Sequence, residues 1–177
     1  MGYALTALTV AACGKQAPTP EFHRIQASQP DESGWSLAES TNGNFSVRLP
    51  IPFQDFSVSE DSPDSETLVA DTVGGTSAEG IKFSATKITY RLPGGAARRF
   101  EMVKNGLSFA SENVTLTKFG DNDAANIECR SSTSGASMRA VLIGEHLFML
   151  IVEWPAAEQK LAKRLAPVFL DSLRVGE

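Results

Sequence analysis

Histidine and cysteine are scarce in this chain of 177 residues, which has two of each. A closed structural zinc site needs four ligands, most of them Cys or His. Cys13 belongs to the N-terminal signal described below, which leaves His23, His146 and Cys129, one ligand too few for such a site. The sequence therefore predicts neither a metal nor a cofactor. There is also no Gly-x-Ser-x-Gly motif, so the nucleophile elbow of a serine hydrolase is missing.

Clusters of positive charge and long apolar runs are missing as well. The chain has 16 Lys and Arg against 21 Asp and Glu, a net charge of −5, and the basic residues are scattered. A nucleic-acid partner is therefore not expected, because binding to phosphates needs a basic patch. No stretch reaches the roughly 20 apolar residues that span a bilayer as a helix. The remaining composition, 42% hydrophobic and 21% charged, is typical of one globular domain with a tail.

The N-terminus has the composition of a secretory signal. Residues 1–12 are apolar or small and end immediately before Cys13. Signal peptidases need small side chains near the cleavage point, which Ala11 and Ala12 provide. The polar, proline-bearing stretch that follows predicts a flexible tether. We therefore expect a signal peptide over residues 1–12, a tether over 13–34 and a globular domain over 35–177.

The sequence Val10-Ala11-Ala12-Cys13 resembles the lipobox of bacterial lipoproteins, whose cysteine is acylated and becomes the first mature residue. The resemblance implies that Cys13 carries the lipid and that the membrane is a partner. Gly14 in place of Asp implies, by resemblance to Gram-negative lipoproteins, the periplasmic side of the outer membrane. No Lys or Arg precedes Cys13. The alternative is a buried N-terminal strand or helix with an ordinary cysteine, which would be able to pair with Cys129.

The strongest structural pattern lies near the C-terminus. A strand over residues 137–143 turns into a second strand over residues 146–154, in which both alternating faces are apolar. Such a strand is buried on both sides, which predicts a central place in a sheet that is covered on both faces. A helix should start at Pro155, and Pro167 should kink or divide it.

The remaining elements follow from apolar periodicity. We expect further strands over residues 35–39, 45–49, 66–73, 81–90, 114–119 and 124–131, with a glycine-bearing connector over 74–80. A helix over 96–111 should place Ala96, Phe100, Val103, Leu107 and Ala110 on one stripe against the sheet. These elements predict an α+β fold, an antiparallel sheet with helices packed on it.

Two short motifs and this order of elements resemble the PsbP-like family. The motifs are Asn44-Phe45-Ser46-Val47-Arg48-Leu49-Pro50 and Phe169-Leu170-Asp171-Ser172-Leu173-Arg174. The family includes extrinsic photosystem proteins, a Ran-binding nuclear transport factor and many bacterial lipoproteins. The resemblance covers Trp35 to Arg174 and implies a three-layer α/β/α sandwich. It implies little about activity, because one fold serves many functions.

One candidate binding site lies at the start of the predicted helix over 96–111. Gly94 and Gly95 precede the helix, and Arg98 and Arg99 lie in its first turn. Unpaired amides and the helix dipole favour an anion at such a place. The alternative is that the glycines only turn the chain and the arginines form a solvated face.

The other candidate side chains have simpler interpretations. His146 is able to pair with Glu128 or Glu145, whereas His23 in the expected tether would be too mobile for catalysis. Cys129 should point inward as a small apolar side chain. The acidic segments, Asp121-Asn122-Asp123 and Asp61 with Asp64, lack the spacing of a calcium loop and are read as polar turns.

The sequence therefore predicts a non-enzymatic lipoprotein domain, tethered on the periplasmic side of a bacterial envelope, that acts as an interaction or accessory module for an envelope protein. The alternative is a small-ligand or metal-binding envelope protein with a pocket between the sheet and the helix over 96–111. A filled interface there would favour the first function. An enzyme would need His146 exposed beside a carboxylate and a hydroxyl.

Overall fold

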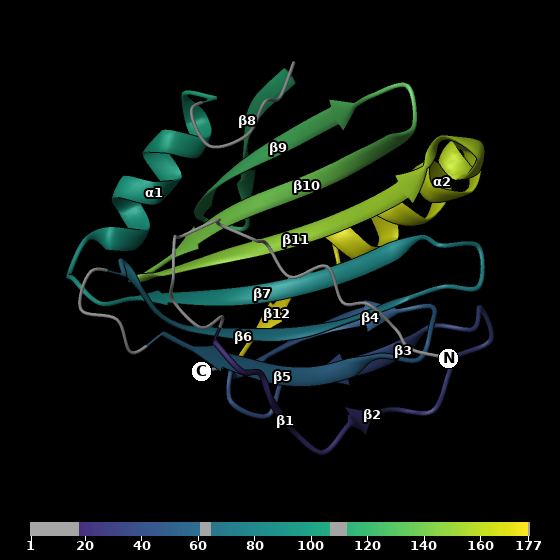
Figure 1. The fold of residues 1–177 in the computed structure, drawn as a ribbon, viewed down its shortest axis with the longest axis horizontal. Coiled ribbons are helices and arrows are strands. Elements are labelled where there is room, and N and C mark those ends of the chain that lie inside the picture. Colours follow the sequence, from purple (N-terminus) through teal and green to yellow (C-terminus); the bar gives the residue numbers. More distant parts are fainter. Residues whose placement is uncertain (1–17, 61–64, 107–112, 177) are drawn as a thin grey trace.

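The computed structural model describes residues 18–60, 65–106 and 113–176. These residues form an α+β fold of two antiparallel sheets and two α-helices (Figure 1). The larger sheet has eight strands in the order β1 (Glu21–Phe22), β5 (Gln54–Ser59), β6 (Thr67–Thr76), β7 (Lys82–Tyr90), β11 (His146–Pro155), β10 (Ser134–Ile143), β9 (Asn122–Arg130) and β8 (Asn113–Phe119). The smaller sheet has four strands in the order β12 (Arg174–Val175), β4 (Phe45–Leu49), β3 (Ser36–Glu39) and β2 (Gln26–Ala27).

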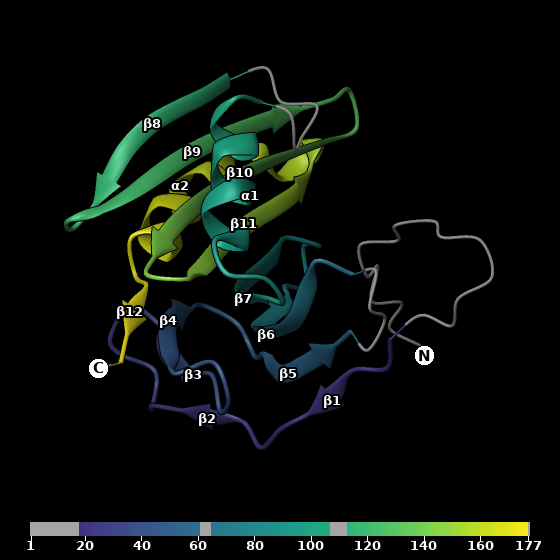
Figure 2. The same ribbon diagram turned by 90° about the vertical axis from the view of Figure 1, so that its left-hand side faces the viewer.

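The two helices cover opposite faces of the larger sheet (Figure 2). Helix α1 (Gly95–Lys104) packs on β7, β8, β10 and β11, and we name this side the α1 face. Helix α2 (Gln159–Leu170), preceded by a 3-10 turn (Ala156–Glu158), packs on β10 and β11 from the other side, the α2 face, and also contacts β4 of the smaller sheet. The layer on the α2 face thus combines a helix with a second sheet. The predicted α+β class is confirmed, but the three-layer α/β/α sandwich is not.

Strand β11 occupies the central position that its sequence predicts. It pairs with β7 on one side and β10 on the other. Leu147 and Met149 belong to the core on the α1 face, and Phe148 and Leu150 belong to the core on the α2 face. Each fully buried side chain of this size stabilises the fold by about 1.5–3 kcal/mol. Strand β11 supplies such side chains to both cores and is therefore part of both.

Residues 18–34 lie along the edges of both sheets, and we name them the N-terminal strap. Within the strap, β1 pairs with β5 and β2 pairs with β3. The His23 amide donates to the Asp55 carbonyl at 2.8 Å. The folded part therefore begins before Trp35, and the prediction of a flexible tether is wrong for residues 18–34. Strands of two residues are too short to leave a periodic pattern, which is why no pattern in the sequence indicated them. Residues 1–17, including Cys13, lie outside the described residues.

Two further differences concern β5 and β6. Strand β5 was not expected, because its inward residues Asp55 and Ser57 are polar and conceal the alternation. Strand β6 continues to Thr76 through Gly74 and Gly75, which were expected in a loop. A Cβ on Gly74 would lie 2.4 Å from the carbonyl oxygen of Phe83. The glycines are therefore needed because neighbouring backbone comes too close for a side chain.

The helices are shorter than expected. Helix α1 ends at Lys104, and residues 107–112, on which the end of the expected helix falls, lie outside the described residues. Helix α2 contains Pro167 in its last turn and is not divided there. None of the described helices has the length and the apolar run that crossing a bilayer requires.

Candidate functional site

A group of polar side chains, buried at its centre and open to solvent at its edge, joins the strap to the larger sheet, and we name it the strap cluster. It consists of His23, Thr41, Asn42, Asp55, Ser57 and Asp71. Asp55 and Ser57 come from β5, Asp71 comes from β6, and Thr41 and Asn42 come from the turn between β3 and β4. The cluster therefore joins the strap, both sheets and the β3–β4 turn.

The hydrogen bonds of Ser57 fix the chemistry of the strap cluster. Its hydroxyl donates to Asp71 Oδ1 at 2.6 Å, and its oxygen lies 2.8 Å from His23 Nε2. The tautomer of His23 that carries its proton on Nε2 lets the ring donate to the Ser57 oxygen, whose own proton is directed to the carboxylate. The side-chain nitrogen of Asn42 lies 3.4 Å from the same oxygen and 3.2 Å from His23 Nε2.

This arrangement of hydrogen bonds around Ser57 differs from the one around a catalytic serine. In a Ser–His pair the imidazole takes the proton of the serine, whereas here the Ser57 proton is directed to the carboxylate of Asp71. Ser57 is also only 6% exposed, which keeps substrates away from its oxygen. The arrangement acts as a polar bridge between strap and sheet. The expectation that His23 is mobile is wrong.

Asp55 is the most deeply buried charged residue of the cluster, with 1% of its surface exposed. Its Oδ2 accepts hydrogen bonds from the hydroxyl of Thr41 at 2.6 Å and the amide of Thr41 at 2.9 Å. Its Oδ1 accepts none from any described residue. A buried acceptor without a partner costs free energy, so Thr41 is important for holding this carboxylate.

His146 lies on the same face of the larger sheet as the strap cluster. Ser57 of β5 is opposite Asp71 of β6, which is opposite Lys87 of β7. Two residues further along β7, on the same face, Thr89 is opposite His146 of β11. His146 Nδ1 lies 3.3 Å from the Thr89 hydroxyl, so its hydrogen-bond partner is neither Glu128 nor Glu145. Burial, and next the positive charge of Lys87, lower the pKa of His146, while Glu145 and Asp71 act in the opposite direction. The register thus brings both histidines of the chain to one face, which no spacing in the sequence indicates.

The predicted anion site at the start of α1 has few free donors. Gly94 is the N-cap with a φ of 74°, and the Gly95 amide donates to the carbonyl of Leu92. The exposed Arg98 forms an ion pair of 2.6 Å with Glu66, and Arg99 is half-buried. Gly95 is buried against Tyr90, and burial raises the pKa of Tyr90 to about 12. The arrangement resembles a tight helix start more than an open anion site.

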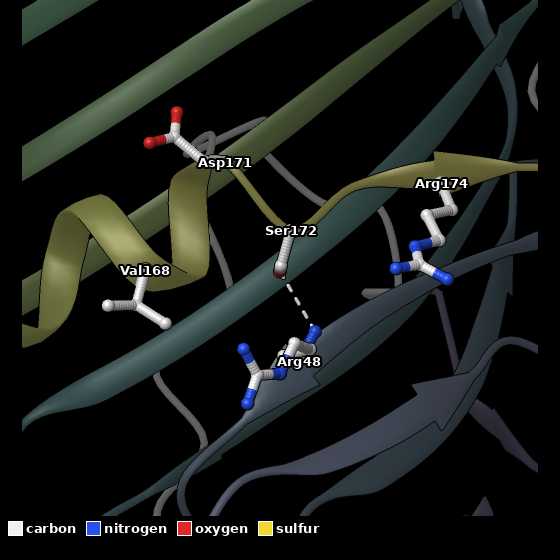
Figure 3. A pocket seen from close by; sticks show the side chains of 5 residues that line it. All are labelled: Arg48, Val168, Asp171, Ser172 and Arg174. Carbon is white, nitrogen blue, oxygen red and sulfur yellow. Dashed lines mark hydrogen bonds between the residues drawn. The ribbon is translucent and has the colours of Figure 1, made fainter. Parts of the chain in front are cut away.

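An open surface depression of about 310 Å³ lies where α2 meets the smaller sheet. Figure 3 shows Arg48 and Arg174 around it, with Val168 on the side of the helix. Most polar groups here already have partners, since Ser172 Oγ accepts from the Arg48 amide and Arg48 also pairs with Asp31. Hydrogen bonds from Ser33 and Trp35 and the charge of Arg48 lower the pKa of Asp31 to about 2.

The space between α1 and the sheet is filled by side chains. Phe100 and Val103 of α1 are buried against Ile127, Leu147 and Met149. The pocket required by the alternative ligand-binding function is therefore not formed by the described part of α1. In the described ranges no three acidic, His or Cys side chains are grouped so that they could hold a metal ion. Cys129 points toward this core and is half-buried, in agreement with its predicted orientation.

The other half of the α1 face, over β5 and β6, carries apolar side chains that stay partly exposed. Phe56 and Val58 of β5 lie opposite Thr72 and Ala70 of β6, and Ile88 of β7 continues the row. We name Phe56, Val58, Ala70 and Ile88 the open half-face. Contiguous apolar side chains that are not fully buried are typical of interaction surfaces.

No protein-family model and no curated protein sequence matches the chain. Among solved structures the chain is similar to LpqN, a protein involved in cell envelope biogenesis of Mycobacterium tuberculosis. The TM-score is 0.43 at 13% sequence identity, over 93% of this chain and 88% of that one.

Proposed function

We propose that this protein is a non-enzymatic lipoprotein domain, anchored through Cys13 on the periplasmic side of a bacterial envelope, that acts as an interaction or accessory module. The observation that carries the proposal is the course of the strap. The strap, which begins five residues after Cys13, is bound to the sheet through His23, Ser57 and Asp71. An acyl group at Cys13 would therefore hold the whole domain, and not a loose tail, at the membrane.

Acylation is tested by growing bacteria that produce the chain with radiolabelled palmitate. The wild type should carry label and sediment with membranes, and Cys13→Ser should lose both. Cys129→Ser is the matched control, since it removes the other cysteine and should keep label and membrane association. Label that persists in Cys13→Ser would refute the anchor.

The open half-face is the surface that we propose for an envelope protein partner. Its apolar side chains are partly exposed, and burying them against a partner would be favourable by about 25 cal/mol per Å² before the costs of association. Cross-linking in intact cells should enrich one defined set of proteins with the wild type. Val58→Asp should lose that set, and Leu116→Asp, at an exposed site on the distant strand β8, should keep it. Loss with both variants or with neither would contradict this surface.

The order of hydrogen bonds supports the non-enzymatic part of the proposal. The Ser57 proton is directed to Asp71 and not to His23, and Ser57 is only 6% exposed. We further infer that the fold is a variant of the PsbP-like sandwich in which the smaller sheet shares the α2 layer. Both motif segments support this: Phe45–Leu49 forms β4, and the segment from Phe169 leads from α2 into β12, which pairs with β4.

A further inference from the structure

We propose that the β1 edge of the domain lies on the lipid surface, with Phe22 and Ile25 inserted between the lipid headgroups. This inference rests on the proposed anchor at Cys13 and adds the orientation of the domain to it. The partner is a bilayer, recognised by apolar side chains at an edge that is tied closely to the acyl chains.

Exposure identifies the side chains that would insert. Phe22 is 55% exposed and Ile25 is 54% exposed, although both are large and apolar. They lie three residues apart in the strap, with the exposed cation Arg24 between them. Apolar side chains beside a basic residue are also what bind interfacial helices to a membrane, where the apolar side lies about 5–10 Å deep at the boundary between headgroups and acyl chains.

The strap is held well enough to act as a docking edge. The ring of Phe22 packs on Phe56 with 5.7 Å between ring centroids. On the other side of the strand, His23 is bonded to Ser57, and Ser57 is bonded to the buried Asp71. Phe22 is therefore presented from a fixed edge, so its insertion would not require the strap to become ordered first.

Chain length sets the orientation. Glu21, the first residue of β1, is only eight residues after Cys13. Even a fully extended chain of that length reaches about 28 Å. The opposite edge of the larger sheet, β8, is seven strand spacings away from β1, which is about 34 Å. Figures 1 and 2 both show β1 and β8 at opposite ends of the molecule. The segment between Cys13 and Glu21 is short and ends at the β1 edge, which also carries the two exposed apolar side chains. Both features favour contact of the β1 edge with the lipid surface.

Bromolipid quenching of tryptophan tests the proposed orientation. Phe22→Trp and Leu116→Trp place a probe on the two opposite edge strands, at sites of nearly equal exposure, 55% and 58%. The native Trp35 and Trp154 are buried and give the same background in both variants. Each full-length variant is isolated from bacterial membranes and reconstituted in vesicles of phosphatidylcholine brominated near the headgroup. Quenching should be at least about twofold stronger for Phe22→Trp, because a side chain at that depth contacts the bromine atoms. Equal quenching, or stronger quenching of Leu116→Trp, would overturn the proposal.

A second preparation separates the two proposals, acylation of Cys13 and contact of the β1 edge with the membrane, so that either can fail without the other. Mass spectrometry of the isolated chain records whether Cys13 carries acyl groups, which tests the proposed function. The same quenching is then measured on the full chain with Cys129→Ala and a diacyl maleimide lipid coupled to Cys13. This sample is anchored by construction, so its quenching ratio tests the orientation whatever the mass spectrum shows. As a check on specificity, Ile25→Ser in the Phe22→Trp background should reduce the quenching.

Discussion

At the residue scale, Ser57 links the only histidine of the strap to a buried carboxylate. Ser57→Ala would leave Asp71, which is 5% exposed, without its hydroxyl donor. A buried acceptor that loses its partner costs about 1–3 kcal/mol. The free energy of unfolding, measured with urea, should fall by that amount. Ser59→Ala, at an exposed site on the same strand, should change it by less than about 0.5 kcal/mol.

His146 gives the domain a pH dependence whose sign is fixed by its surroundings. Burial and Lys87 lower its pKa below the ordinary value of 6.5, so the folded protein binds this proton less readily than the unfolded chain does. The stabilising contribution of neutral His146 is therefore complete above about pH 6.5 and is lost progressively as the pH falls below that value. Unfolding measured between pH 7 and pH 5 should depend less steeply on pH in His146→Gln.

The role of Lys87 in that shift is tested separately by NMR titration of the His146 ring. Lys87→Gln removes a positive charge near the imidazole and should raise the pKa of His146. Lys82→Gln changes a lysine of the same strand whose side chain points to the other face, and should leave the titration unchanged. An unchanged midpoint in Lys87→Gln would show that burial alone causes the shift.

At the element scale, Arg139 of β10 fixes the end of α2. Its guanidinium donates to Asn126 Oδ1 at 2.8 Å and to the carbonyl of Leu170 at 3.0 Å, and it pairs with Asp171. The helix C-terminus carries partial negative charge, so an arginine there is doubly favourable. Arg139→Met should speed amide exchange in the last turn of α2 by about tenfold or more, since each 1.4 kcal/mol is a factor of ten. Arg164→Met, at an exposed site of α2, is the control and should change little.

Elements with clear apolar periodicity could be predicted from the sequence, and those without it could not. Strand β11 is apolar on both faces, and its central position followed from that alone. Strand β5 was not predicted because its inward-facing residues, Asp55 and Ser57, are polar. In the structure they form hydrogen bonds with Thr41 and Asp71. The strap escaped because its two strands have two residues each. Strand β5 and the strap are both defined by pairing with residues far away in the sequence and not by a local pattern. The strap cluster could not be predicted because it is built on these two elements.

At the scale of the whole molecule, the strap connects the N-terminal segment to two sheets, because β1 extends the larger sheet and β2 extends the smaller one. The sequence predicted a tether up to residue 34 and a domain from residue 35. In the structure the domain also includes residues 18–34. This shortens any leash between Cys13 and the fold. With the proposed anchor at Cys13, the fold would then set the orientation of the domain at the membrane, since a longer linker would let the domain turn freely.

The attachment of the strap can be measured by limited proteolysis at Arg24, which is exposed in the strap between β1 and β2. Proteases cut a segment in its locally open state, so the rate of cleavage follows the free energy of opening. His23→Phe removes the hydrogen bond to Ser57, which contributes about 1 kcal/mol. Trypsin should therefore cleave after Arg24 about fivefold faster, while global unfolding by urea changes less. Asn42→Ala removes the longer contacts of 3.2 Å to His23 and 3.4 Å to Ser57 but leaves the bond of 2.8 Å between His23 and Ser57, so it should have a smaller effect. Equal rates in His23→Phe and wild type would mean that backbone pairing alone holds the strap.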